Sequence, residues 1–182
     1  MTAASQVVIP MADMRFYSVF HTAAGWVGLR YSTSGLRRVI LPRRSAREVQ
    51  ELIGEAAVHA PDSCADLQER LLTYFSGRRA DFPDELDFSG ATPFQRQVWQ
   101  VTRLIPYGET RSYQWVAEQI GKPGAARAVG QALGKNPLPV IVPCHRVLAS
   151  DGGPGGYIGG IEMKKLLLEL EGISTFPQTR KK

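Results

Sequence analysis

The start of a helix at Thr92 divides this chain into two stretches of different character. Thr92 is followed by Pro93, Phe94 and Gln95, which supplies an N-cap residue, a proline at the first helical position and a glutamine that completes a capping box. Strand patterns precede this point, and helical patterns follow it. Because the two kinds of element are segregated, we expect an α/β N-terminal domain with a small antiparallel sheet, then a mainly α-helical domain.

The first stretch predicts strands followed by two helices. Turn signals such as Ala24-Gly25 separate the strands, and Ser45 with Glu48 three positions later marks the start of a helix. The second helix ends at Ser76-Gly77, and Cys64 lies in its first turn, where we interpret it as structural. The expected strands cover residues 15–21, 26–31 and 36–41, with a short fourth strand at 86–88; the second helix covers 60–75.

The second stretch predicts two short helices joined by a glycine-containing turn, which is the pattern of a helix-turn-helix. Ser112 caps the first of these helices, and Gly134 ends the second. The expected helices cover residues 93–104, 113–120, 125–133 and 160–171. The domain boundaries that follow are a leader at 1–13, a first domain with its linker at 14–91, a second domain at 92–172 and a basic tail at 173–182.

Positive charge is concentrated in the second stretch. Residues 1–92 carry 10 Lys and Arg against 11 Asp and Glu, whereas residues 93–150 carry 7 against 2. A basic half beside a neutral one favours a surface that faces a polyanion. An ordinary solvated basic face is the alternative, and the pI near 9.4 does not decide between them.

Composition narrows the class of protein further. No apolar run approaches the roughly 20 residues of a membrane-spanning helix, and no secretory signal is evident. The two cysteines, Cys64 and Cys144, stand far apart, which favours a reducing compartment and disfavours a disulfide framework or a thiolate zinc site. We therefore expect a cytoplasmic protein without a membrane segment.

Cys144 is the conspicuous chemical group of the chain. The thiolate is the nucleophilic form of cysteine, and His145 and Arg146 follow directly, where a charged or hydrogen-bonding neighbour favours ionisation. The apolar residues 140–142 indicate a buried, strand-like segment that carries the thiol to the floor of a pocket. On this adjacency alone a buried structural cysteine is the more common outcome.

More than adjacency is present, because the surrounding sequence resembles the O6-alkylguanine-DNA alkyltransferase family. The resemblance is dense over residues 92–172 and only general over 15–91. Its most specific part is Pro-Cys-His-Arg-Val at 143–147 with Arg-Ala-Val-Gly upstream at 127–130. The other matching segments are Phe94-Gln-Arg-Gln-Val-Trp99, Ile105-Pro-Tyr-Gly-Glu-Thr-Arg-Ser-Tyr113, Gly156-Tyr-Ile-Gly-Gly160 and Lys164-Lys-Leu-Leu-Leu-Glu-Leu-Glu171.

The resemblance implies a DNA repair protein that moves the alkyl group of O6-alkylguanine, and by extension of O4-alkylthymine, irreversibly onto Cys144 in a single turnover. It implies minor-groove binding by the helix-turn-helix, extrusion of the damaged nucleotide, and no cofactor. It also implies a ribonuclease-H-like N-terminal domain and a monomer that can assemble cooperatively on DNA. Some members carry zinc in the N-terminal half, but His21 and His59 are too few to form that site here.

The resemblance also assigns roles to individual residues. His145 takes the thiol proton through a water molecule, Glu171 orients His145, and Asn136 holds the active-site loop. Tyr113 and Tyr157 contact the flipped nucleotide, and Arg127 fills the gap that it leaves. Further substrate contacts are expected from Val147, Ile158, Gly159 and Lys164, and further DNA contacts from the small or polar residues Ala126, Gly130 and Gln131.

One residue departs from the family pattern, and several other readings compete. Ile158 is bulky where family members carry a small residue, so we expect it to restrict large alkyl groups. A DNA-binding protein that recognises the lesion without transfer is the main alternative, although such relatives replace the cysteine. A helix-turn-helix transcription factor and a cysteine hydrolase explain fewer of these motifs.

Overall fold

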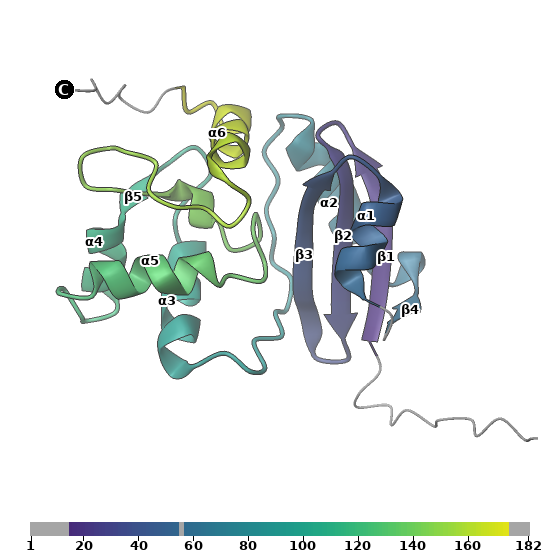
Figure 1. Ribbon diagram of the computed structural model, residues 1–182, viewed down its shortest axis with the longest axis horizontal. Coiled ribbons are helices and arrows are strands. Elements are labelled where there is room, and N and C mark those ends of the chain that lie inside the picture. The colour runs from purple at the N-terminus through teal and green to yellow at the C-terminus, as the bar shows by residue number, and fades with distance from the viewer. Residues whose placement is uncertain (1–14, 55–56, 175–182) are drawn as a thin grey trace, which may run out of the picture.

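The computed structural model describes residues 15–54 and 57–174 of the chain. It contains a sheet-bearing half and a helical half, which lie side by side in Figure 1. The boundary near Thr92 is where the chain leaves the first half for the second. The expected leader at 1–13 and most of the expected tail lie outside the described residues.

The sheet has four strands in the order β3-β2-β1-β4. The three long strands β1 (Arg15–Thr22), β2 (Gly25–Ser32) and β3 (Gly35–Arg43) are antiparallel neighbours, as expected. The short β4 (Val58–His59) pairs in parallel with β1, so the sheet is mixed rather than antiparallel. A strand of two residues carries no periodic pattern, so hydrophobic periodicity does not predict it. The strand expected at 86–88 is reduced to a single bridge between Leu36 and Leu86.

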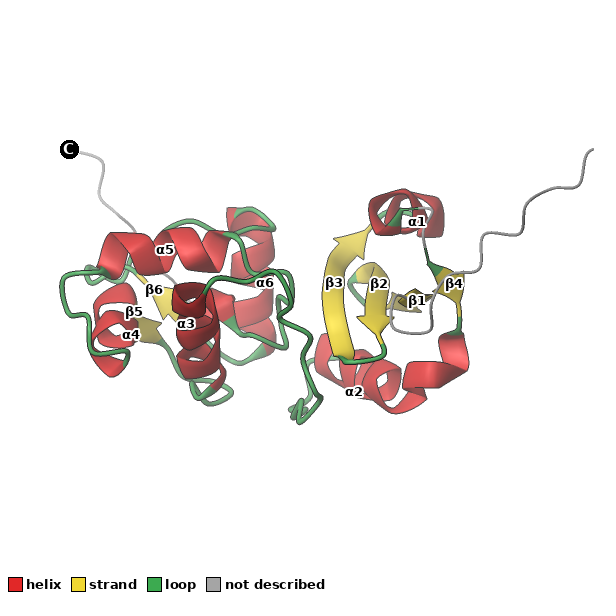
Figure 2. Cartoon of the chain, turned by 90° about the horizontal axis from the view of Figure 1, so that it is seen from below, coloured by secondary structure: helices red, strands yellow, loops and turns green. Residues whose placement is uncertain are grey.

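Two helices cover the opposite faces of this sheet, as Figure 2 shows. One is α1 (Ala46–Ile53), whose N-cap Ser45 accepts a hydrogen bond from the backbone N–H of Glu48. The other is α2 (Ala65–Phe75), which follows the 3-10 turn η2 (Pro61–Cys64). Alternate β2 residues face α2, and Gly28 faces α1, where an added Cβ would lie 2.4 Å from Val49.

The helical half contains the expected helix-turn-helix. The helix α3 (Pro93–Arg103) begins with the complete capping box between Thr92 and Gln95. The pair α4 (Tyr113–Gln119) and α5 (Ala126–Gly134) packs against it, and α6 (Ile161–Leu170) closes the chain's described part. Two short parallel strands, β5 (Arg111–Ser112) and β6 (Val147–Leu148), tie the start of α4 to the segment after Cys144.

The segment before Cys144 is not the strand that its apolar residues predicted. Val140, Ile141 and Val142 are buried, but Val140 and Ile141 form a turn, Val142 makes only an isolated bridge with Pro139, and Val140 has a φ of 76°. Cys144 then opens the 3-10 turn η3 (Cys144–Arg146). A continuous apolar run reports burial on all sides and does not by itself distinguish a strand from a buried turn.

The two halves share contacts along the edge of β3. The backbone N–H of Val39 donates to the carbonyl of Pro137 at 2.9 Å, and that of Leu36 donates to Glu85 of the linker at 2.9 Å. Buried residues from both halves form one continuous hydrophobic cluster. The site-bearing loop after α5 is therefore held against the sheet. In the described part of the chain, no helix is long and apolar enough to cross a membrane.

Candidate active site

Cys144 is buried, with 3% of its surface exposed. Burial raises the pKa of its thiol, because a low-dielectric environment disfavours the charged form. A hydrogen bond from the Asn136 side chain and the positive charge of Lys164 act in the opposite direction. Ionisation of the thiol therefore depends on Asn136 and Lys164, which oppose the effect of burial.

Asn136 is fully buried and uses its whole amide. Its Nδ2 donates to the carbonyl of Val142 at 3.0 Å and to Sγ of Cys144 at 3.2 Å, and its Oδ1 accepts from the N–H of Leu138 at 2.9 Å. These contacts fix both ends of the turn that precedes Cys144. The structure thus places Asn136 against the active-site loop and in direct contact with the thiol.

His145 is fully buried and faces Glu171. Its Nε2 lies 2.7 Å from Oε1 of Glu171, and its Nδ1 has no hydrogen-bond partner among the described residues. Because Glu171 is ionised, a proton on Nε2 satisfies both groups and leaves Nδ1 as an acceptor. Burial lowers the pKa of His145, and the hydrogen bond and charge of Glu171 oppose that change.

Glu171, at the C-cap of α6, is 5% exposed and is held by several donors. Arg146 contacts it twice, at 2.8 Å through Nε and 2.9 Å through Nη2, and donates through Nη1 to the carbonyl of Ile105 at 2.6 Å. Burial alone would raise the pKa of Glu171. The hydrogen bonds from His145 and Arg146 outweigh burial and hold it at about 2. Arg146 therefore serves the carboxylate and not, as its position in sequence suggested, the neighbouring thiol.

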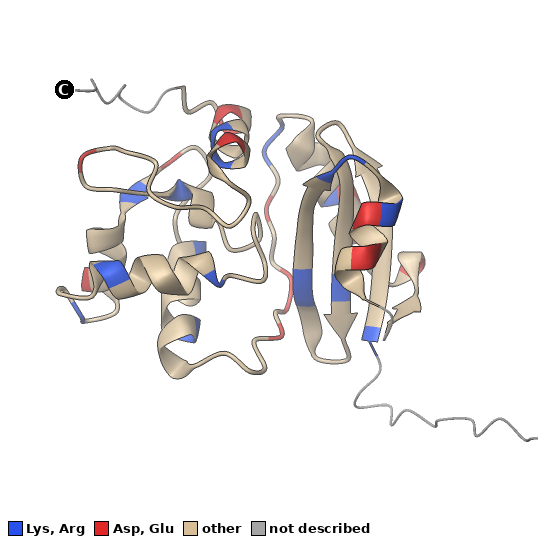
Figure 3. Cartoon of the chain, in the orientation of Figure 1, with Lys and Arg blue, Asp and Glu red and all other residues tan. Residues whose placement is uncertain are grey.

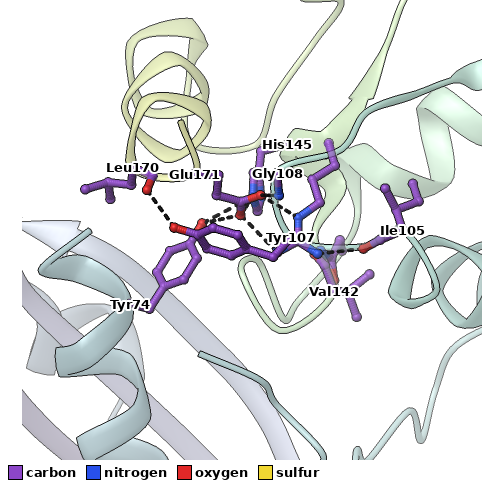
Figure 4. A network of polar contacts seen from close by, with 10 residues as sticks. Tyr74, Ile105, Tyr107, Gly108, Val142, His145, Leu170 and Glu171 are labelled. Carbon is purple, nitrogen blue, oxygen red and sulfur yellow. Dashed lines mark hydrogen bonds and ion pairs between the residues drawn. The ribbon is translucent and has the colours of Figure 1, made fainter. Parts of the chain in front are cut away.

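Sequence reasoning missed three groups that complete this network, drawn in Figure 4. Tyr74 of α2 donates its hydroxyl to Oε1 of Glu171 at 2.7 Å, and that hydroxyl lies 3.2 Å from Nε2 of His145. The N–H of Gly108 donates to Oε2 of Glu171 at 3.1 Å, and the hydroxyl of Tyr107 donates to the carbonyl of Leu170 at 2.7 Å. Tyr74 comes from the other half of the molecule, and no local pattern linked it to His145.

The thiol opens into a pocket of about 610 Å³. Cys144 contributes to its wall together with Tyr113, Tyr157 and Ile158, which sequence analysis assigned to substrate. The same pocket is lined by the residues of α5 that were assigned to DNA, namely Ala126, Arg127, Gly130 and Gln131. The structure thus joins a buried nucleophile to the exposed second helix of the helix-turn-helix.

A glycine-rich loop over this pocket carries Tyr157. The Tyr157 hydroxyl is buried beside the thiol of Cys144, and its interaction with the thiol helps to lower the pKa of Cys144. Burial, and then the nearby Cys144, raise the pKa of Tyr157. The hydroxyl of Tyr113 donates to the carbonyl of Gly156 at 3.3 Å, so the start of α4 is hydrogen-bonded to the loop.

Lys164 of α6 supports the same loop from a fully buried position. Its Nζ donates to the carbonyl of Val147 at 2.6 Å and to that of Pro154. Burial lowers the pKa of Lys164 to about 8, against a smaller opposing effect of Cys144. Lys164 thus connects the segment after Cys144 to the glycine-rich loop and brings a positive charge near the thiol.

The remaining predicted residues fall into different places. Arg127 is exposed and forms no ion pair with any residue that the structure describes. Ile158 is 48% exposed at the rim. Val147 is buried, and Gly159 packs against Leu41 of β3. Neither Val147 nor Gly159 lines the pocket that contains the thiol. Within the described ranges, no group of three or more His, Cys, Asp or Glu residues could hold a metal ion.

Comparison with known proteins gives concordant matches. Residues 93–173 match the family model for the DNA-binding domain of 6-O-methylguanine DNA methyltransferase. A methylated-DNA–protein-cysteine methyltransferase of Mycobacterium tuberculosis is 53% identical over 111 residues, covering 61% of this chain and 67% of the relative. The Methanosarcina acetivorans protein of the same name is 37% identical over 164 residues, covering 86% of this chain and 98% of the relative.

Solved structures extend the similarity to the N-terminal half. The Mycobacterium tuberculosis OGT in complex with DNA superposes with a TM-score of 0.74 at 42% identity, covering 86% of this chain and 92% of the other. The O6-methylguanine-DNA methyltransferase of Pyrococcus kodakaraensis gives 0.65 at 30% identity, covering 87% and 99%. Both halves, and not the pocket region alone, therefore match this group of proteins.

Proposed function

This chain belongs to the methylated-DNA–protein-cysteine methyltransferase family, and from that premise we propose that it repairs O6-alkylguanine in duplex DNA by taking the alkyl group onto Cys144. The observation that carries the proposal is the shared pocket of Cys144 and the exposed residues of α5. A DNA-binding helix beside a buried nucleophile is what a lesion-specific transfer reaction needs. The product is a thioether, so the protein acts once.

The reaction is an in-line displacement at the alkyl carbon. The thiol proton of Cys144 passes through one water molecule to Nδ1 of His145, and the thiolate then forms the new sulfur–carbon bond. The bond between that carbon and O6 breaks, and its electron pair leaves with the guanine. The guanine takes up a proton at N1, which balances the proton lost by the thiol, so no cofactor or other reactant enters.

Glu171 supports this transfer through His145. Its contact with Nε2 fixes the orientation of the ring and stabilises the imidazolium that forms, as a carboxylate does in catalytic triads. Arg146 and Tyr74 hold the carboxylate in turn. Glu171 is thus a positioning residue, while Cys144 and His145 act on the transferred group and the proton.

Access to the thiol requires the damaged nucleotide to leave the duplex. Extrusion costs a few kcal/mol, and least for a damaged base. Arg127 is exposed and free of ion pairs among the described residues, so its guanidinium can enter the gap and stack there. Tyr113, at the edge of the pocket, contacts the rotated nucleotide. Ile158 at the rim favours small alkyl groups. O4-alkylthymine is a second substrate, because its alkyl group is also bound to an exocyclic oxygen of the base.

The cellular setting follows from the same features. Cys64 and Cys144 are both free thiols, which suits a reducing, cytoplasmic compartment. We expect a monomer in solution that assembles cooperatively on longer DNA. A binding protein that recognises the lesion without transfer remains the competing function, and Cys144 in the pocket wall argues against it.

The deciding experiment is the intact mass of the protein after incubation with a duplex that carries O6-methylguanine. We expect a gain of about 14 Da on Cys144 at stoichiometric yield, located by peptide mapping. The Cys144→Ala variant should bind the same duplex and gain nothing. Tight binding without any mass gain in the parent protein would establish the recognition-only function instead.

A further inference from the structure

A second concave surface lies between β3 and the loop that follows α5. It is a groove of about 470 Å³ with five Arg and Lys residues and no Asp or Glu in its wall. Its apolar rim includes Ile158, which also lines the pocket of Cys144. The groove therefore begins at the mouth of the active-site pocket and extends toward the sheet. The basic residues are Arg30, Arg37, Arg38, Arg43 and Lys135.

This groove lies on the same side of the molecule as the helix assigned to DNA. In Figures 1 and 2, α5 and α1 both lie on one side, with α2, α3 and α4 on the other. Figure 3 shows basic segments on β2, on β3 and at the end of α5 on that side. Lys135 is the C-cap of α5, so the groove continues the line of this helix onto the N-terminal half.

Three of the five cations have no carboxylate partner among the described residues. Arg37 pairs with Asp87 at 3.3 Å, and Arg43 with Glu48 at 3.5 Å. Arg30, Arg38 and Lys135 form no such pair. The protein therefore compensates two of the five positive charges and leaves the other three without a carboxylate partner among the described residues.

The arrangement of Arg30 and Arg38 is unfavourable unless an anion binds. The two residues are direct partners across β2 and β3, and like charges in that position destabilise a sheet. Each donates one hydrogen bond to a carbonyl at the end of α1, at 3.0 Å to Ile53 and 3.1 Å to Leu52. Those bonds account for one nitrogen each, and Nε of Arg30 is buried without a partner in the described part.

We propose that this groove binds the phosphodiester backbone of the DNA that flanks the extruded nucleotide. The proposal rests on the proposed function, since it extends the DNA-binding surface from α5 across Lys135 to Arg38 and Arg30. The groove is suited to phosphate. Guanidinium groups bind phosphate through two parallel hydrogen bonds, and the wall contains no carboxylate that would repel it. Such contacts add affinity and orientation without reading sequence.

The test is the salt dependence of binding to a fluorescently labelled, undamaged duplex, measured by anisotropy. Each phosphate contact contributes about 0.9 to the slope of log K against log salt. We expect Lys135→Gln to lower that slope by about one and Arg38→Gln with Lys135→Gln to lower it by about two. Binding by the double variant should weaken by more than about tenfold near 0.1 M salt. An unchanged slope in both variants would overturn the proposal.

Two controls separate the possible causes. Arg47 is an exposed cation of α1 outside the groove and pairs with Glu51, so Arg47→Gln should leave the slope as in the parent. An equal loss with Arg47→Gln would mean general charge rather than a groove. If Arg38→Gln unfolds because it loses the bond to α1, the exposed Lys135→Gln decides alone. Absence of alkyl transfer in the parent protein would defeat the proposed function and leave the slope measurement to judge the groove.

Discussion

At the scale of single residues, the site depends on how one buried carboxylate is neutralised. Glu171 receives hydrogen bonds from His145, Arg146, Tyr74 and the backbone of Gly108, which come from three separate parts of the chain. A buried carboxylate is tolerated when it is paired with cations and hydrogen-bond donors. Removing it destabilises the fold, because a buried cation such as Arg146 is then left without a counter-charge. The same carboxylate therefore controls both stability and the state of the histidine.

We predict that Glu171→Gln destabilises the protein by about 3 kcal/mol at pH 7, because it leaves Arg146 buried without a counter-charge. The pKa of Glu171 is about 2 in the folded protein and 4.5 without the fold. A carboxyl with a lowered pKa contributes stability above pH 4.5 and loses it as pH falls toward 2. Urea unfolding should therefore show a smaller difference between parent and variant at pH 3 than at pH 7.

The control for that prediction is Glu169→Gln, which changes an exposed residue of the same helix. It should alter stability by less than about 0.5 kcal/mol at either pH. If Glu171→Gln costs the same at pH 3 and pH 7, its effect comes from packing and not from the ionised carboxylate.

Lys164→Met tests whether this lysine acts on the thiol as well as on the loop. Its charge lowers the pKa of Cys144, so its loss should raise that pKa and shift the rise of transfer rate with pH to higher pH. A shift of one pH unit would slow transfer about tenfold at pH 7 and much less near pH 10. The shift is measured from transfer rates between pH 6 and 10. Lys165→Met, at the half-buried neighbouring lysine, is the control. If transfer slows equally at every pH, Lys164 supports the glycine-rich loop and does not act on the pKa of the thiol.

Many residues of the candidate site could be named from the sequence, because the resemblance to a known family extends over residues 92–172. The structure brings Asn136 into contact with Cys144 and Glu171 into contact with His145, and the catalytic roles of these residues stay predictions. The role of Arg146 could not be predicted from adjacency, since η3 turns its side chain toward Glu171 and away from the thiol. Ile158, which the resemblance assigned to the substrate, lines the pocket and is 48% exposed, and its effect on large alkyl groups stays a prediction.

At the scale of elements, local signals were reliable where a cap or an alternation defined them. The N-caps at Ser45, Thr92 and Ser112 all accept the expected backbone hydrogen bonds. Elements without such signals were missed or misread, namely β4 and the turn with its isolated bridge at 140–142. Their conformation is set by tertiary contacts, such as the amide of Asn136 that holds Val142.

The glycine-rich loop gives the prediction that belongs to this scale. Gly155 has a φ of 60°, and an added Cβ would lie 2.5 Å from the hydroxyl oxygen of Tyr113. Gly155→Ala should therefore displace the loop or Tyr113 and slow transfer from duplex DNA by about tenfold, at a strain cost of about 1 kcal/mol. Gly156→Ala is the matched control, because no atom lies within 4 Å of its added Cβ. Equal rates for the two variants would show that the loop tolerates displacement.

At the scale of the whole molecule, the N-terminal half contributes directly to the site. Its covering helix α2 places Tyr74 between Phe75, Phe82 and Tyr107, and the Tyr74 hydroxyl reaches both His145 and Glu171. The sequence predicted this half to support the other by packing. It could not predict a hydrogen bond between positions 71 residues apart, which exists only because β3 and α2 meet the helical half.

We predict that Tyr74→Phe slows alkyl transfer without weakening DNA binding. Burial raises the pKa of Tyr74 well above its usual value, so its hydroxyl stays protonated and donates to Glu171. Without that hydrogen bond the carboxylate becomes more basic and holds a proton on His145 more strongly. The acid limb of the pH–rate profile should then move to higher pH, and unfolding should cost about 1 kcal/mol less.

The matched variant is Tyr107→Phe, which removes a hydroxyl that donates to the carbonyl of Leu170 and leaves His145 untouched. Tyr107→Phe should lower stability by a similar amount and keep the acid limb where it is in the parent. Free O6-methylguanine as substrate removes DNA binding from the comparison, and the Tyr74→Phe effect should persist with it. If the two variants share one pH profile, the N-terminal half only buttresses the site. If they differ as expected, a residue outside the DNA-binding domain sets the proton affinity of the histidine, and the two halves form one catalytic unit.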